Sequence, residues 1–390
     1  MRMKTFARFT CVAAATAAFI APALAGAQDD IEIGGQKVVT LSRKAVSTTR
    51  PEFTSVTIAP GRGMELLKLT ANFPGKGEVQ VLYGPDLSSV GLTNTKQMLD
   101  VQDDANGDFG YRLGAAFLFP YPNRIRGTLS ADGKTLTTQW NGKTITLPAN
   151  NAGKLPTAEK HAMHGLILKA KADNVKVVKI PGGEMLTAVI HAGDFGGHWF
   201  SKTDLDFTIT LTGTYLDATV IAHNVGKESE PVSIGWHPYF NFPSGDRSQV
   251  KIEIPGAKYA TVDNYDNVFP TGKLLPVDGT QYDLRAAGGV ALAKNFYDDN
   301  WSSLDWKNGA ATVKVIDPAA KYGVSVEGIS PLIKTIQMYA PPTQQFAAIE
   351  HQFNFADPFS KVWNGMDTGM VTLKPGQRTQ WKVRLRVFVP

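Results

Sequence analysis

Residues 204–213 read DLDFTITLTG, and every second side chain in this stretch is apolar. The apolar residues fall on one side of an extended chain: Leu205, Phe207, Ile209 and Leu211. Residues 250–254 (VKIEI) and 380–388 (QWKVRLRVF) alternate in the same way. Successive side chains of a strand point to opposite faces, so this period of two is typical of half-buried antiparallel strands.

Turn signals connect the expected strands. Residues 130–148 read SADGKTLTTQWNGKTITLP, in which Asp132-Gly133 and Asn141-Gly142 are favoured two-residue hairpin turns. Convincing amphipathic helices are few, and one short helix is expected near residues 95–100 or 358–363.

The chain contains no internal repeat and no linker that would divide it into two large domains. A β-sandwich can exceed 200 residues without splitting. We therefore predict an all-β fold, one large antiparallel β-sandwich over residues 54–390, preceded by a polar, loose lead-in over residues 28–53.

Residues 1–27 have the features of a secretory signal peptide. Arg2, Lys4 and Arg8 form a cationic start, residues 11–20 form a short apolar run, and residues 23–27 offer small-residue cleavage sites. The alternative is an uncleaved membrane anchor, but the run is shorter than a span of about 20 residues. We expect cleavage and a periplasmic or secreted protein with no membrane span in its mature chain.

Cleavage changes the composition of the mature chain. It removes Cys11, the only cysteine, so neither a disulfide nor a thiol nucleophile is expected. It also removes three cations and no acid, so the formal charge of +5 falls by three to +2. Lysine and arginine are spread along the chain without a basic cluster between aromatic residues, which argues against nucleic acid as a partner.

Metal and nucleotide motifs are weak or missing from the sequence. The seven histidines form no spaced zinc motif, and HAGDFGGH (residues 191–198) and DDANGD (residues 103–108) are interpreted as an ordinary loop and turn. There is no GxSxG elbow, P-loop or dinucleotide fingerprint. We expect neither a metal nor an organic cofactor.

Several polar residues stand out within apolar, β-rich stretches. Each has an ordinary structural explanation when it is taken alone. Their contexts are PYPNRIRG (residues 120–127), MHGL (163–166), IGWHPYFNF (234–242), NFYDDNW (295–301) and FAAIEHQF (346–353).

Together these stretches resemble the aldose 1-epimerases, the galactose mutarotases. PYPNRIRG, MHGL, HPYFNF, FPTGKLLPVDGTQYDLR, YDDNW and AIEHQFNFADPF occur in the order seen in that family, and TLKPGQRTQWKVRLRVF is similar to its closing strand. The resemblance runs from about Arg62 to the C-terminus. It implies a large antiparallel β-sandwich with a pyranose-binding face and a reaction that interconverts α- and β-anomers.

The resemblance also implies roles for individual residues. Glu350 matches the general base and His237 the general acid, while His164 matches a second active-site histidine. The sugar-binding positions are matched by Arg124 and Asp298, with Asn123 beside them. Asp299 is an alternative to Asp298, since aligning DDNW leaves an error of one residue open. His351 has no assigned role, and strand alternation should point it away from Glu350.

These residue types suit mutarotation. The reaction removes the proton of the anomeric hydroxyl and protonates the ring oxygen, for which a carboxylate and a histidine supply base and acid. Two alternatives remain from the sequence: a non-catalytic carbohydrate-binding protein, and a lyase or glycosidase on the same sandwich. The expected partner is a small-molecule sugar such as glucose or galactose; its identity, any phosphate on it and the oligomeric state stay open.

Overall fold

The computed structural model describes residues 31–88, 91, 114–153 and 155–390. The predicted signal peptide with Cys11, the DDANGD stretch and the helix considered near residues 95–100 lie outside the described residues. In the described part of the chain, no helix is long and apolar enough to cross a membrane.

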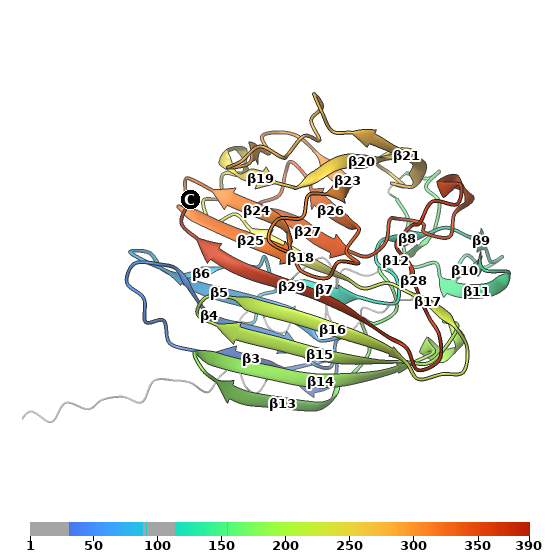
Figure 1. The fold of residues 1–390 in the computed structure, drawn as a ribbon, viewed down its shortest axis with the longest axis horizontal. Coiled ribbons are helices and arrows are strands. Elements are labelled where there is room, and N and C mark those ends of the chain that lie inside the picture. Colours follow the sequence, from blue (N-terminus) through green and yellow to red (C-terminus); the bar gives the residue numbers. More distant parts are fainter. Residues whose placement is uncertain (1–30, 89–90, 92–113, 154) are drawn as a thin grey trace, which may run out of the picture.

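Two large antiparallel sheets dominate the described residues (Figure 1). The larger sheet consists, in spatial order, of β21 (Pro270–Pro276), β20 (Gly256–Val262), β23 (Tyr297–Leu304), β26 (Thr335–Ala340), β27 (Phe346–Gln352), β18 (Gly235–Asn241), β7 (Ala115–Leu118), β5 (Glu65–Phe73), β4 (Glu52–Ala59) and β3 (Val39–Ser42), with β6 (Gly77–Gln80) also paired to β5. The predicted all-β fold is confirmed.

The second large sheet carries the alternating segments recognised in the sequence. It consists of β13 (Asp173–Ile180), β14 (Gly183–Gly193), β15 (Thr203–Thr212), β16 (Leu216–Asn224), β29 (Arg378–Phe388), β25 (Tyr322–Gly328), β24 (Ala311–Asp317), β19 (Lys251–Glu253) and β22 (Val290–Ala291). In β15, buried and half-buried side chains alternate, as the period of two predicts.

Four smaller strand groups and three short 3-10 helices complete the described fold. The strand groups are β1 (Glu32–Ile33) with β2 (Gln36–Lys37), β9 (Thr128–Leu129) with β10 (Thr135–Trp140) and β11 (Lys143–Pro148), β8 (Arg124–Ile125) with β12 (Ala162–Met163), and β17 (Glu230–Val232) with β28 (Val371–Leu373). The helices are η2 (Phe195–Gly197), η3 (Arg247–Gln249) and η4 (Lys361–Trp363). The last of these falls within the helix considered at residues 358–363.

Aromatic side chains join the two large sheets. Phe117 on β7 lies 5.1 Å, centroid to centroid, from Phe207 on β15 and 6.1 Å from Trp381 on β29. Trp236 on β18 lies 6.3 Å from the same Trp381. All four side chains are almost fully buried. Buried aromatic residues contribute the largest apolar areas, so this cluster holds one face of the larger sheet against the second sheet. His237 follows Trp236 in β18 and therefore points to the opposite face.

The two predicted hairpin turns have different outcomes. Asn141 and Gly142 both have positive φ (48° and 77°) and connect β10 to β11 directly, as a two-residue type I′ turn requires. The prediction for Asp132-Gly133 is wrong, because the connection from β9 to β10 is longer. The Asp132 carboxylate accepts from the backbone N–H of Lys134, and this Asx turn widens the loop.

The N-terminal segment expected to be a loose lead-in contains β1, β2 and β3. Ile33 and Leu41 are fully buried, and Gly34 approaches the backbone of Gly61 too closely for any side chain. These strands have two to four residues, which is too short for an alternating pattern to be visible in the sequence.

The packing of the MHGL stretch against Phe119 can be tested at Gly165, which follows His164. Gly165 has a φ of +84°, and a Cβ added there would lie 2.3 Å from the carbonyl oxygen of Phe119. The Gly165→Ala variant should therefore lower the free energy of unfolding by at least about 2 kcal/mol. Chemical denaturation of purified protein measures the change.

Gly142→Ala is the matched control. Gly142 has a similar φ of +77°, but nothing lies within 4 Å of an added Cβ. The free energy of unfolding of the Gly142→Ala variant should fall by only about 1 kcal/mol, because backbone strain is its only cost. Equal losses for the two variants would show that the contact with Phe119 is unimportant.

Candidate active site

Three neighbouring strands of the larger sheet place acidic and amide side chains on one face. Gln337 on β26 lies directly opposite Glu350 on β27, and Asp298 on β23 lies opposite Tyr339, two residues along from Gln337. Residues two apart in a strand and residues paired across strands share a face. Asp298, Gln337 and Glu350 therefore point to the same side of the sheet.

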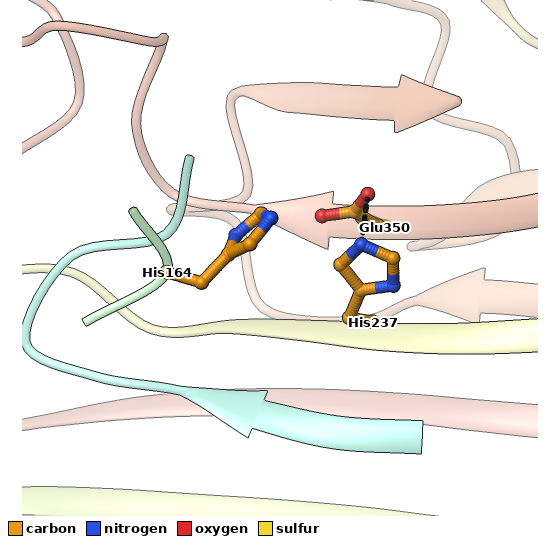
Figure 2. A group of neighbouring side chains, drawn as sticks. All are labelled: His164, His237 and Glu350. Carbon is orange, nitrogen blue, oxygen red and sulfur yellow. Dashed lines mark ion pairs between the residues drawn. The ribbon is translucent and has the colours of Figure 1, made fainter. Parts of the chain in front are cut away.

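Strand β18 brings a histidine against this face. Tyr239 pairs with Ala348, and two residues further along this antiparallel register His237 lies opposite Glu350. His237 Nε2 is 3.1 Å from Glu350 Oε1, and both side chains are buried (Figure 2). The His237 ring stacks on Tyr239 at 4.8 Å, which restricts its rotation.

A second histidine, His164, directly follows strand β12 of the short β8–β12 pair. The backbone N–H of His164 donates to the carbonyl of Asn123 (2.9 Å), and the backbone N–H of Asn123 donates to His164 Nδ1 (3.2 Å). A backbone N–H can only donate, so Nδ1 uses its lone pair and the neutral ring keeps its proton on Nε2. His164 lies 5.0 Å from His237, ring to ring, and points toward Glu350 (Figure 2).

A closed ring of hydrogen bonds connects four further side chains. Arg124 donates from Nη1 to Asn123 Oδ1 (3.0 Å) and from Nη2 to Asp298 Oδ2 (3.1 Å). Gln337 donates to Asp298 Oδ1 (2.7 Å) and accepts from Asn123 Nδ2 (3.1 Å). Each member restrains the next, so the guanidinium, carboxylate and amide groups are held in place beside the histidines.

These groups line a cavity of about 540 Å³. This volume is within the usual range for small-molecule sites, about 300–1,000 Å³. The cavity is partly open to solvent, and six aromatic rings line it: Tyr83, Tyr239, Tyr265, Phe296, Tyr339 and Phe346. Five of the neighbouring pairs among these rings have centroids 4.9 to 6.4 Å apart, so the aromatic wall is nearly continuous.

Burial has a strong electrostatic effect on Glu350. Removal from water raises the pKa of its carboxyl group well above the usual range, and the negative charge of Asp298 raises it further. The hydrogen bond from Gln352 Nε2 (2.6 Å) and the charge of Arg124 act in the opposite direction. His237 Nε2 is in contact with the Glu350 carboxyl group, so the charge of either group acts directly on the other.

His164, His237 and Glu350 resemble a metal-binding trio, since their donor atoms lie within 4.8 Å of one another. The hydrogen bond from Asn123 argues against that use. It occupies the lone pair of His164 Nδ1, while Nε2 carries the proton of the neutral ring. The arrangement is suited to donating a hydrogen bond from His164 into the cavity.

All six site residues predicted from the sequence line this one cavity: Asn123, Arg124, His164, His237, Asp298 and Glu350. Sequence reasoning missed Gln337 and the aromatic wall. Gln337 is not titratable and lies in TIQMYA, a short strand with little alternation. Its position opposite Glu350 becomes visible only when the strands are paired.

The two neighbouring acids of β23 face opposite sides. Asp298 lines the cavity, whereas Asp299 is buried away from it and accepts a hydrogen bond from the Tyr265 hydroxyl (2.8 Å). Burial raises the pKa of Asp299 to about 7. The geometry therefore favours Asp298 over Asp299 as the residue that meets a ligand.

Three histidines to which the sequence assigns no role, His351, His191 and His198, each contact another group of the protein. His351 points away from Glu350, as strand alternation predicts, and its Nε2 lies 3.1 Å from the carbonyl of Ala311. Burial lowers the pKa of His351 to about 4, so it is a neutral core residue at neutral pH. His191 pairs with Asp204 (3.0 Å) and His198 with the carbonyl of Thr146 (2.8 Å), so these two do not share one site.

Comparison with known proteins agrees with this geometry. A family model described as aldose 1-epimerase matches residues 79–386, most of the chain. The chain belongs to the aldose 1-epimerase family. This confirms the resemblance found in the sequence, and it places this epimerase among isomerases that act on sugars. No curated protein matches this epimerase in sequence.

Solved structures share the fold of this aldose 1-epimerase. A galactose mutarotase-like protein from Clostridium acetobutylicum has a TM-score of 0.67 at 22% identity, covering 91% of this chain and 96% of the other. An aldose epimerase homologue from C. elegans has a TM-score of 0.62 at 17% identity, with coverages of 90% and 99%. A galactose 1-epimerase from Lactobacillus acidophilus NCFM has a TM-score of 0.60 at 14% identity. The match covers 90% of this chain and 99% of the other. At these identities the likeness is one of fold.

The raised pKa of Glu350 has a measurable consequence for the stability of this epimerase. A carboxyl group with a higher pKa in the folded state contributes stability below its unfolded pKa, and this contribution is lost as the pH rises through the folded pKa. Glu350→Gln removes the group. The variant should therefore gain stability relative to the wild type as the pH rises from 5 to 9.

Urea denaturation at several pH values measures this difference. Each pH unit between the unfolded pKa and the folded pKa should add up to about 1.4 kcal/mol in favour of the variant. A difference between the two proteins that stays constant with pH would contradict the raised pKa.

Proposed function

We propose that this protein is an exported aldose 1-epimerase that interconverts the α- and β-anomers of a neutral aldose by acid–base ring opening and reclosure. The contact between His237 and Glu350, at 3.1 Å inside the sugar-sized cavity, carries the proposal. The hydroxyl oxygen and the ring oxygen of a pyranose are both attached to C1. An adjacent base and acid can therefore reach both oxygens at once.

The proposed reaction begins with the ring closed. Glu350 takes the proton from the C1 hydroxyl, and His237 gives a proton to the ring oxygen, O5. The C1–O5 bond breaks, its electron pair stays on O5, and a carbonyl forms at C1. The protein then holds a protonated Glu350 and a neutral His237, while the open-chain sugar is neutral.

Rotation about C1–C2 turns the other face of the carbonyl toward O5. His237 then takes the proton from the O5 hydroxyl as O5 attacks C1, and Glu350 returns its proton to O1. The original protonation states are restored, and no co-reactant is consumed. His164 supports the reaction by donating from Nε2 to a sugar oxygen, because Asn123 holds its other nitrogen.

The ring of Asn123, Arg124, Asp298 and Gln337 is proposed to bind the sugar hydroxyls. Charged donors and acceptors that are already held in place lose little freedom when a ligand binds. Arg124 is the only lysine or arginine among the described residues that line the cavity, and its charge is paired with Asp298. This pairing favours a neutral aldose over a sugar phosphate, which would need an available cation.

Two other functions suit the site less well. A non-catalytic sugar-binding protein has no need for a buried acid and base in contact, because burying ionisable groups costs free energy. A glycosidase needs two carboxyl groups on either side of the bond that it breaks. Here Glu350 faces a histidine, and both oxygens of Asp298 accept hydrogen bonds from Arg124 and Gln337.

Export is proposed from the sequence of residues 1–27. Its cationic start, short apolar run and small-residue cleavage sites are those of a secretory signal peptide. We propose a periplasmic or secreted location, where the enzyme would meet free sugars outside the cytoplasm.

Substitutions of the acid and the base test the mechanism. Glu350→Gln cannot take a proton and His237→Asn cannot give one, so each should lower kcat by at least about 10²-fold with a smaller effect on KM. Polarimetry of freshly dissolved α-glucose and α-galactose measures the rate. The acid limb of the pH profile of kcat/KM should lie above the range of an ordinary carboxyl group, because the pKa of Glu350 is raised.

The same assay separates binding from catalysis. Asp298→Ala and Arg124→Ala should mainly raise KM, whereas Asp299→Asn, which can still accept from Tyr265, should change KM by less than about threefold. Near-normal turnover by Glu350→Gln would exclude the mechanism. Wild-type protein that binds sugars without turning over either one would support the sugar-binding alternative.

Mass spectrometry of the exported protein tests the location. The N-terminus should lie between Gly26 and Gln28, so the mature protein should contain no cysteine and should not react with a thiol reagent. Detection of Cys11 in protein recovered outside the cytoplasm would show that the segment is retained.

A further inference from the structure

A second, much smaller cavity lies behind Arg124. Its volume is about 10 Å³, enough for about one water molecule. All four residues of the hydrogen-bonded ring border it, together with Asn300. Its apolar walls come from Ala260, Val262, Val268, Pro270 and Ala356.

Asn300 is placed in this cavity by the register of β23. It lies two residues beyond Asp298, on the same face of the strand, and pairs with Gln337 on one side and Ala260 on the other. Its side chain is 5% exposed. Asn300 borders the small cavity and not the large one, so it is not placed to touch the sugar itself.

Three buried polar atoms around this cavity have no hydrogen-bond partner among the described residues. They are Nε of Arg124 and the side-chain oxygen and nitrogen of Asn300. Buried polar groups are nearly always paired, and a buried group without a partner costs about 1–3 kcal/mol. Nε of an arginine can only donate, so its partner must be an acceptor.

We propose that Asn300 positions the guanidinium group of Arg124 through one buried water molecule. The water accepts from Arg124 Nε–H and donates to the side-chain oxygen of Asn300. A buried water with two or more polar partners in a cavity of this size is a regular part of protein structures. One water satisfies the Nε–H and one end of the Asn300 amide.

This contact gives Arg124 a third fixed point. Nη1 and Nη2 donate to Asn123 and Asp298, which are both proposed to meet the sugar. When a sugar hydroxyl competes for these groups, the contact at Nε still holds the plane of the guanidinium. Asn300 is therefore a positioning residue for sugar binding, and this role rests on the proposed function of Arg124.

The first test is a high-resolution crystal structure of the wild-type protein. Electron density for one ordered water should lie within hydrogen-bonding distance of both Arg124 Nε and the Asn300 amide. This readout does not depend on activity. A direct bond between Asn300 and another protein group, with no water beside Nε, would overturn the proposal.

The second test is a double-mutant cycle measured by sugar mutarotation. Asn300→Leu keeps the size of the side chain and removes its polar atoms. It should raise KM by about three- to tenfold, as expected for one lost hydrogen bond, and change kcat by less than about twofold. In the Arg124→Ala background, the same substitution should have no further effect on KM.

Ser302→Ala provides the matched control. Ser302 is also a buried polar residue on the same face of β23, but it does not border the small cavity. Its substitution should leave KM unchanged. If Asn300→Leu changed KM equally in the wild-type and Arg124→Ala backgrounds, the positioning role would be refuted. A wild-type protein without mutarotase activity would instead refute the proposed function, and the crystal structure would then decide whether the water is present.

Discussion

Glu350 lies in β27, a strand in which every residue is buried. The neighbouring side chains of the site compensate for the free energy that it costs to remove its carboxyl group from water. An ionised carboxylate without partners is too costly to keep in such a position. Here one oxygen faces His237 and the other accepts from Gln352. Arg124 and Asp298 pair with each other close by, so His237 is the ionisable partner in direct contact with Glu350.

The sequence predicted the sheets best where one face is exposed. Strand β15 alternates clearly, because its second face is half-exposed. Strands β26 and β27 are covered on both faces, so their residues form nearly continuous buried runs without a period of two. Periodicity alone could not show on which side Glu350 lies, or that Gln337 stands opposite it. The family resemblance selected the six site residues, and strand pairing added Gln337.

The turns show the same limit at a smaller scale. Two glycine-containing dipeptides, Asp132-Gly133 and Asn141-Gly142, have equal hairpin signals, and only the second forms a two-residue turn. The difference arises from a side-chain hydrogen bond of Asp132 that competes with the tight turn. The lead-in strands were missed because their stability comes from burial of Ile33 and Leu41 against distant parts of the chain, and not from a local pattern.

The opposite orientation of Asp298 and Asp299 limits how this enzyme can change during evolution. Inserting or deleting one residue within β23 would exchange the two acids, turn Asn300 to the other face and reverse each side chain beyond it. The loop between β20 and β21 has no alternating register to preserve, and it carries Tyr265 in the aromatic wall. A change in the length of that loop would therefore alter the aromatic wall while Asp298 and Asp299 keep their faces.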